Sequence, residues 1–129
     1  MHRGFLITGA LLAALAVIFG AFGAHGLKPL LTEKELVTFE TGVRYQFYHA
    51  FALLVTGILF REASRNYLRW AGRLFSIGIL IFSGSLYVLT AMKLYGDIKI
   101  QWLGPITPIG GVCFVVGWFM MIMAIIKKN

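Results

Sequence analysis

The feature that most constrains this chain is the recurrence of long apolar segments without charged residues. A helix needs roughly 20 apolar residues to cross about 30 Å of hydrocarbon. Residues 5–24, 74–92 and 106–126 satisfy this requirement. Of the 129 residues, 59% are hydrophobic and only 13% are charged, so a soluble domain would lack enough polar side chains to cover its surface. The sequence therefore predicts an integral membrane protein.

A fourth apolar segment is shorter and begins with polar residues. Residues 47–60 carry no charge, but as a helix they fall about two turns short of the hydrocarbon thickness. A full span would begin near Thr41 and would carry the polar residues of "TGVRYQFYH" to membrane depth. Upstream, Thr32 and Glu35 have the spacing of a capping box, which predicts that this helix begins near Glu33 as an amphipathic extension.

These segments predict an all-α membrane protein, an antiparallel bundle of four transmembrane helices in a single domain of residues 1–129. The expected spans are residues 5–24, 41–60, 74–92 and 106–126.

The first apolar segment has two interpretations. "HR" before it and "AFGA" near its end are typical of a secretory signal peptide. Small residues, however, recur in it every three or four positions, and such a stripe lets another helix approach closely. We expect this stripe to face another helix, and it consists of Gly9, Ala13, Ala16, Gly20 and Gly23. Other glycines expected at helix contacts are Gly84, Gly110, Gly111 and Gly117.

The distribution of Lys and Arg predicts the orientation, because short cytoplasmic loops are enriched in these residues. Residues 61–73 are expected to form a loop that carries Arg61, Arg65, Arg69 and Arg73. The opposite side mixes basic residues with acidic ones. We therefore expect both termini and residues 61–73 on the cytoplasmic side of the plasma membrane, with residues 28–40 and 95–102 outside. The formal charge of +7 does not indicate nucleic acid, because the cations flank apolar segments whose expected neighbours are membrane lipids.

Polar side chains gather toward the outer ends of the expected spans. Tyr45 and His49 share a helix face, and Glu40 lies one turn before Arg44 as a possible partner. Ionisable groups inside a span can mark a ligand site. The hypothetical ligand-binding residues are His49, Tyr45, Gln46, Ser83, Tyr87, Thr107, Arg44 and His25. Thr107 is also expected to cap the fourth helix, with Pro108 at its first position.

These residues also have structural explanations that remain open. Arg44 could snorkel to the interface beside Tyr45 and Tyr48, and His49 could form an interhelical hydrogen bond. The serines could bond to their own helix backbone. No His pair has the HxxxH spacing and no acidic residue lies within a span, so no metal or other cofactor is expected. No nucleophile paired with a base is visible either, so no enzymatic activity is expected.

Four phrases, "GAFGAHGL", "TGVRYQFYHAFALL", "FSGSLYVL" and "GPITPIGGVCFVVGW", resemble domain of unknown function family 423, which consists of small bacterial inner-membrane proteins. The resemblance covers nearly the whole chain and implies four spans, but it supplies no reaction. The residues that carry it are Gly20, Gly23, Ala24, His25, Thr41, Gly42, Tyr45, Gln46, His49, Ser83, Gly84, Ser85, Leu86, Tyr87, Thr107, Pro108, Gly110, Gly111, Gly117 and Trp118. The family pattern does not demand a cation at Arg44.

Three function classes remain at this stage. The favoured one is a non-enzymatic protein that binds or helps to transport a small molecule or lipid through its outer polar cluster. Four helices enclose little space, so a transporter would have to be a homo-oligomer. The alternative is a structural or accessory subunit that packs against itself or a larger complex, and a membrane enzyme would need chemistry that the sequence does not display.

The predicted orientation can be tested by labelling single cysteines from outside in a Cys113→Ser background. Reagent should modify a cysteine at position 34 or 97 and spare one at position 65, because the arginine-rich segment is expected in the cytoplasm. Labelling at 65 alone would reverse the topology.

Overall fold

The computed structural model describes residues 1–96 and 101–128, and this part of the chain is helical without strands. The predicted all-α class is therefore confirmed for the described residues. Asp97 and Lys99, which belong to the segment expected outside, lie beyond the described residues.

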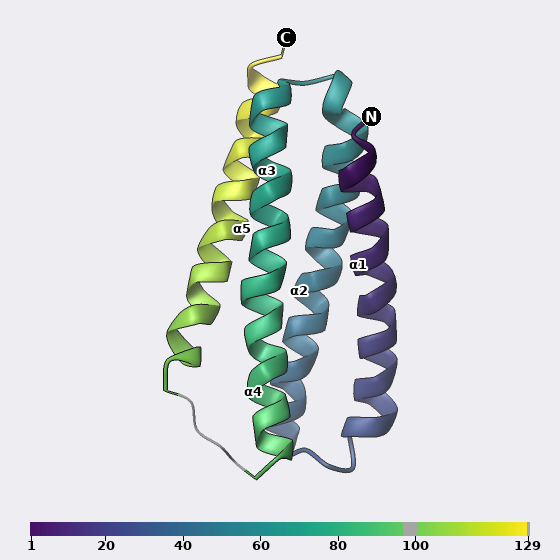
Figure 1. The fold of residues 1–129 in the computed structure, drawn as a ribbon, viewed down its shortest axis with the longest axis vertical. Helices are drawn as coiled ribbons and strands as arrows, with labels where there is room; N and C mark the ends of the chain where they lie inside the picture. The colour runs from purple at the N-terminus through teal and green to yellow at the C-terminus, as the bar shows by residue number, and fades with distance from the viewer. Residues whose placement is uncertain (97–100, 129) are drawn as a thin grey trace.

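The helices form four rods that run alternately up and down (Figure 1). In chain order the rods are α1 (Arg3–Phe22) with the π-helical turn η1 (Gly23–Leu27); α2 (Glu33–Ile58) with the 3₁₀ turn η2 (Leu59–Arg61); α3 (Arg65–Gly78), the π-helical η3 (Ile79–Ser83) and α4 (Gly84–Leu94); and α5 (Leu103–Ile126). Both chain termini and the α2–α3 connection lie at one end, the terminal end. The α1–α2 connection and the end of α4 lie at the other, the loop end.

Three of the rods are long and apolar enough to cross a membrane: Arg3–Leu27, Arg65–Leu94 and Leu103–Ile126. The third rod begins at Arg65, well before residue 74, where the sequence predicted its start. The prediction of a loop over residues 61–73 is therefore wrong for most of that segment, because α3 already begins at Arg65. Leu68 and Ala71 have no exposed surface, so packing of one apolar face draws this arginine-bearing segment into the helix.

The start of α5 also differs from the prediction. The helix begins at Leu103, so Thr107 does not cap it and Pro108 lies inside it. Buried Leu103 lies in the first turn, and Pro105 fits there because the first N–H groups of a helix lack intrahelical partners. Pro108 lies further in and cannot donate to the carbonyl of Gly104.

The second rod begins as predicted. Thr32 caps α2 by accepting from the Glu35 N–H at 3.3 Å, and the Glu35 carboxylate accepts from the Thr32 N–H at 2.9 Å. The predicted capping box is thus confirmed. With 26 residues, α2 is about 39 Å long, which exceeds the hydrocarbon thickness.

Small residues of the first rod lie against α2. A Cβ atom added at Gly9 would stand 2.8 Å from the Ala50 carbonyl oxygen, and one at Gly23 would stand 2.7 Å from the Phe39 ring. Ala16 has no exposed surface and belongs to a cluster with Phe39 and other residues of α2. The helices approach closely here because the small side chains leave room for α2.

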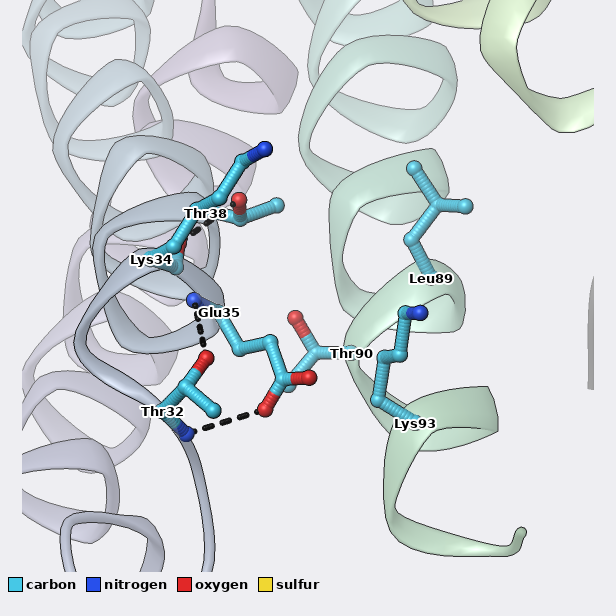
Figure 2. A pocket seen from close by; sticks show the side chains of 7 residues that line it. All are labelled: Thr32, Lys34, Glu35, Thr38, Leu89, Thr90 and Lys93. Atoms are coloured by element: carbon cyan, nitrogen blue, oxygen red, sulfur yellow. Dashed lines mark hydrogen bonds between the residues drawn. The ribbon is translucent and has the colours of Figure 1, made fainter. Parts of the chain in front are cut away.

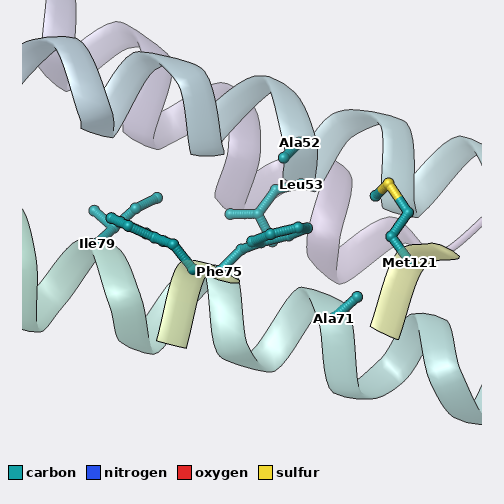
Figure 3. Packing of buried hydrophobic residues seen from close by; sticks show 7 residues of the cluster. Ala52, Leu53, Ala71, Phe75, Ile79 and Met121 are labelled. Carbon is teal, nitrogen blue, oxygen red and sulfur yellow. The ribbon is translucent and has the colours of Figure 1, made fainter. Parts of the chain in front are cut away.

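The larger apolar core joins α2, α3 and α5. Figure 3 labels six of its members, among them Phe75 and Met121. Glycines again set the spacing. A Cβ at Gly110 would stand 2.5 Å from the Phe82 backbone nitrogen in η3, and one at Gly117 would stand 2.8 Å from the Phe75 ring. A Cβ at Gly111 would lie 3.9 Å from the Phe82 ring, an ordinary van der Waals distance. For Gly84, which was also predicted at a helix contact, the Cβ position has no neighbour within 4 Å.

The contact at Gly110 generates a test of this packing. Gly110→Ala should lower the thermal unfolding temperature in detergent, at a cost of about 1–3 kcal/mol, because the new methyl group meets the η3 backbone, which cannot rotate away. Gly104→Ala is the matched control on the same helix, since nothing lies within 4 Å of its Cβ position. Equal unfolding temperatures for the two variants, followed by circular dichroism, would contradict the close α5–η3 contact.

Candidate functional site

Gln46 connects three of the four rods. Its side-chain amide donates to the Leu12 carbonyl of α1 at 2.8 Å, and its carbonyl accepts from the Tyr87 hydroxyl of α4 at 2.7 Å. Only 3% of Gln46 is exposed, so water does not compete for these bonds. The Tyr87 ring packs between Phe19 and Phe39, with centroid distances of 5.1 and 5.3 Å. Gln46 therefore fixes α1 and α4 relative to α2.

Gly42, one turn before Gln46, completes this contact. A Cβ there would stand 2.9 Å from the Tyr87 ring, so the glycine makes room for the tyrosine. The Gly42 carbonyl accepts from the hydroxyl of fully buried Ser83 at 2.6 Å. Ser83 ends the π-helical turn η3, so this bond ties the irregular turn to α2.

A second polar pair joins the third and fourth rods. The hydroxyls of Ser85 and Thr107 lie 2.6 Å apart. Ser85 also donates to the Phe82 carbonyl at 2.8 Å, which uses its single hydroxyl hydrogen, so Thr107 is the donor within the pair. Thr107 thus holds α5 to α4 instead of capping α5.

His49 lies between α2 and α5, with 4% of its surface exposed. Its Nδ1 lies 2.7 Å from the Tyr45 carbonyl oxygen, and its Nε2 lies 3.2 Å from the Trp118 indole nitrogen. The imidazole stacks on the Phe114 ring with 3.5 Å between centroids and 8° between planes.

These two bonds determine the tautomer of His49. The Tyr45 carbonyl can only accept, so Nδ1 carries the hydrogen, and Nε2 is the acceptor for the Trp118 N–H. The ring is neutral in this arrangement, and both its nitrogens are satisfied by protein groups. A second ring proton would remove the acceptor that Trp118 uses.

A groove opens beside His49, between α2 and α5. Its volume is about 580 Å³, within the range of small-molecule sites. Tyr45 and His49 of α2 and Phe82 of η3 line one side. The α5 side consists of Pro108, Gly111, Val112, Phe114, Val115 and Trp118. The groove is therefore apolar and aromatic, with few polar atoms and an open side.

The structure brings together part of the predicted ligand-binding cluster. Gln46 and Tyr87 bond directly, whereas Ser83 bonds to the backbone and Thr107 lies in the separate Ser85 pair. Tyr45, which was expected to share a helix face with His49, is 38% exposed at the groove, with its ring 4.7 Å from that of Phe82. Its side chain makes no hydrogen bond within the described part of the chain.

Two predicted residues lie outside this arrangement. Arg44 is exposed, and no ion pair joins it to Glu40 in residues 1–96 and 101–128. His25 is exposed in the π turn η1. The structure therefore gives neither side chain a place in the groove.

Sequence reasoning did not assign Trp118 and Phe114 to the site. Trp118 had a usable signal, because an indole N–H inside an apolar span needs an acceptor, and few side chains there can accept. Phe114 gave no such signal, since phenylalanine is an ordinary core residue. Its role as the surface on which His49 stacks emerges only from the packing of α5.

Buried polar side chains in the described structure are paired internally. No buried side-chain nitrogen or oxygen there lacks a hydrogen-bond partner. Nor do three His, Cys, Asp or Glu side chains in residues 1–96 and 101–128 converge on a possible metal position. The polar cluster around Gln46 acts as a set of interhelical bonds, whereas the groove beside His49 is an open feature.

Comparisons of the chain with a family model and with individual proteins agree on one family. Residues 19–111 match the family model described as "Protein of unknown function (DUF423)". The chain is 47% identical over 123 residues to the UPF0382 membrane protein SAB0533 of Staphylococcus aureus, which covers 95% of both chains. It is 44% identical over 124 residues to the UPF0382 membrane protein YwdK of Bacillus subtilis, which covers 95% of this chain and 96% of that protein. No solved structure matches the chain significantly.

The Trp118–His49 bond can be tested by removing its donor. Trp118→Phe should destabilise the protein by about 1–2 kcal/mol in thermal unfolding, because it leaves the buried Nε2 of His49 unpaired. Trp102→Phe is the control, since Trp102 is exposed. Adding His49→Met to Trp118→Phe should recover part of the loss, because neither partner is then left unpaired. No difference between the two tryptophan variants would show that the bond contributes nothing.

Proposed function

The chain belongs to the DUF423 family of membrane proteins, and we propose that it crosses the plasma membrane four times and holds an amphipathic small molecule or lipid in the groove beside His49. The protein acts as a binding or transport-related component without catalysis of its own. Its four rods form one domain with the lipid bilayer as solvent.

The proposal that α2 also crosses the membrane, in addition to the other three rods, rests on the depth at which its polar residues would lie. Beginning at Thr41, the second rod reaches Phe60 over about 30 Å, which matches the hydrocarbon thickness. Among its polar side chains in this range, Gln46 and His49 pair with other helices, Thr56 donates to the Ala52 carbonyl of its own helix, and Arg44 lies near an end. The preceding turns, from Glu33 to Glu40, then extend into the head-group layer.

The orientation rests on basic residues. Arg3, Arg61 and Arg65 lie at the terminal end, with Lys127 and Lys128 of the C-terminus. The loop end mixes Lys with Glu in the described residues. The excess of cations at the terminal end supports a cytoplasmic position for both termini.

The single observation that carries the binding role is the groove itself. Its apolar walls suit a hydrocarbon chain, while the Tyr45 hydroxyl offers a hydrogen bond at the open side. The π-helical turn η3 contributes Phe82 to the wall, and π-helical turns often occur at functional sites. A site of this kind selects a ligand by shape and by one polar group.

A structural or accessory role is the second candidate, and a specific observation favours it. Within α1 only Gly9 and Ala16 are buried, whereas Ile7, Leu11 and Ile18 are exposed. Another protein or a second copy could cover this face as well as lipid could. Detection of a homo-oligomer whose formation requires these side chains would favour this role.

The binding role can be tested with the glycine that lines the groove. A Cβ at Gly111 meets only Phe82 at 3.9 Å, so Gly111→Leu should fill the groove without disturbing the fold. The probe is a long-chain alcohol brominated at mid-chain, which quenches tryptophan on contact. Replacing Trp70 and Trp102 with Phe leaves Trp118 as the single fluorescent tryptophan. The quenching of its fluorescence should saturate as the mole fraction of the probe in the micelle rises.

The filled groove should remove this saturation and leave only weak quenching that rises linearly with probe concentration. Gly104→Leu, at an open position on the same helix, should behave like the parent protein. Linear and equal quenching in all three proteins would mean that Trp118 merely faces bulk detergent, and the proposed binding role would fail.

A further inference from the structure

A second cavity, of about 270 Å³, lies at the loop end between the first turns of α2 and the last turns of α4. Figure 2 shows its lining: Thr32, Lys34, Glu35 and Thr38 from the α2 side face Leu89, Thr90 and Lys93 of α4. It is separate from the groove beside His49, with which it shares no lining residue. Its walls carry ammonium groups, a carboxylate and hydroxyls.

The cavity lies at the level of lipid head groups if α2 enters the hydrocarbon near Thr41. Lys34 is seven residues earlier, about 10 Å further out, and the head-group layer is about 5–8 Å thick on each side. The Lys34 side chain runs away from Thr32 toward Thr38, and thus toward the membrane (Figure 2). Its ammonium group therefore comes within reach of the lipid phosphates.

The charges around the cavity have a definite arrangement. Lys34 and Lys93 place cations on opposite helices. The Glu35 side chain extends from α2 toward α4, into the space between these two helices (Figure 2). One Glu35 oxygen accepts from the Thr32 N–H in the capping box, which holds the carboxylate in place. Leu89 adds an apolar surface on the membrane side of Lys93.

We propose that this cavity binds the head group of a phospholipid that carries both a phosphate diester and a primary ammonium group. The phosphate lies between Lys34 and Lys93, the ammonium group donates to Glu35, and the start of an acyl chain lies along Leu89. A glycerol head group has no ammonium group to donate to the Glu35 carboxylate. A trimethylated ammonium group carries no N–H to donate to it.

This inference rests on the proposed membrane placement of α2 but not on the groove beside His49. The two can therefore fail separately. Gly111→Leu, which fills the groove, should leave the head-group preference unchanged, and the cavity variants should leave Trp118 quenching unchanged.

The test is native mass spectrometry of the full-length protein with an equimolar mixture of phosphatidylethanolamine, phosphatidylglycerol and phosphatidylcholine of identical chains. We expect retention of phosphatidylethanolamine with about a fivefold preference, the size of one solvent-exposed ion pair. Glu35→Gln should abolish this preference while keeping the helix capped, because glutamine also serves in a capping box. Lys34→Gln should lower retention of all three lipids, since each has a phosphate.

Glu33→Gln is the matched control, because Glu33 lies in the same turn without lining the cavity and should change nothing. Preference for phosphatidylglycerol in the parent protein would overturn the proposal, as would equal retention of the three lipids. Soluble phosphoethanolamine serves as a further probe. If it bound while the lipids showed no selectivity, the occupant would be a soluble molecule and the lipid site would be refuted.

Discussion

The arrangement of the rods depends on the need to pair polar side chains that α2 carries into the interior. Gln46 can be buried only because a carbonyl of α1 and the hydroxyl of Tyr87 meet its amide. Ser83 reaches Gly42, and Trp118 reaches His49, so the third and fourth rods are each bonded to the same helix. The glycines serve this pairing, because close backbone approach brings short side chains within bonding distance. α2 is therefore the helix around which the other rods are organised.

Sequence reasoning succeeded where a local pattern determines the outcome. The capping box of Thr32 and Glu35 depends on spacing alone. Sequence reasoning failed where long-range packing decides. The preference of proline for a first turn placed the helix start at Pro108, but buried Leu103 and the Ser85–Thr107 bond accompany an earlier start. The π turn η3 has no sequence signal, yet it positions Ser83 and Phe82, so the partner of each polar residue could not be derived from helical periodicity.

The groove follows from how the rods are ordered. α1 packs chiefly on α2, and α5 packs chiefly on α3 and η3, so α2 and α5 meet mainly through side chains such as His49 and Trp118. Gly111 and Pro108 line the groove from α5, and the rings of Phe82 and Phe114, which also line it, lie 5.5 Å apart between centroids. A closed bundle of four helices would fill this space with side chains. The groove is thus a hollow that the order of the rods leaves between α2 and α5.

The hydrogen bonds of His49 limit the chemistry that a ligand in the groove could undergo. Both ring nitrogens are engaged, one with the Tyr45 carbonyl and one with the Trp118 indole, and a face of the ring is covered by Phe114. For His49 to take a proton from a ligand, Nε2 would have to release Trp118 and leave an indole N–H without an acceptor in an apolar groove. Proton transfer through His49 is therefore opposed by the same bond that orients it. A bound molecule would instead meet aromatic surface and the Tyr45 hydroxyl, an environment suited to holding a chain and poorly suited to catalysis.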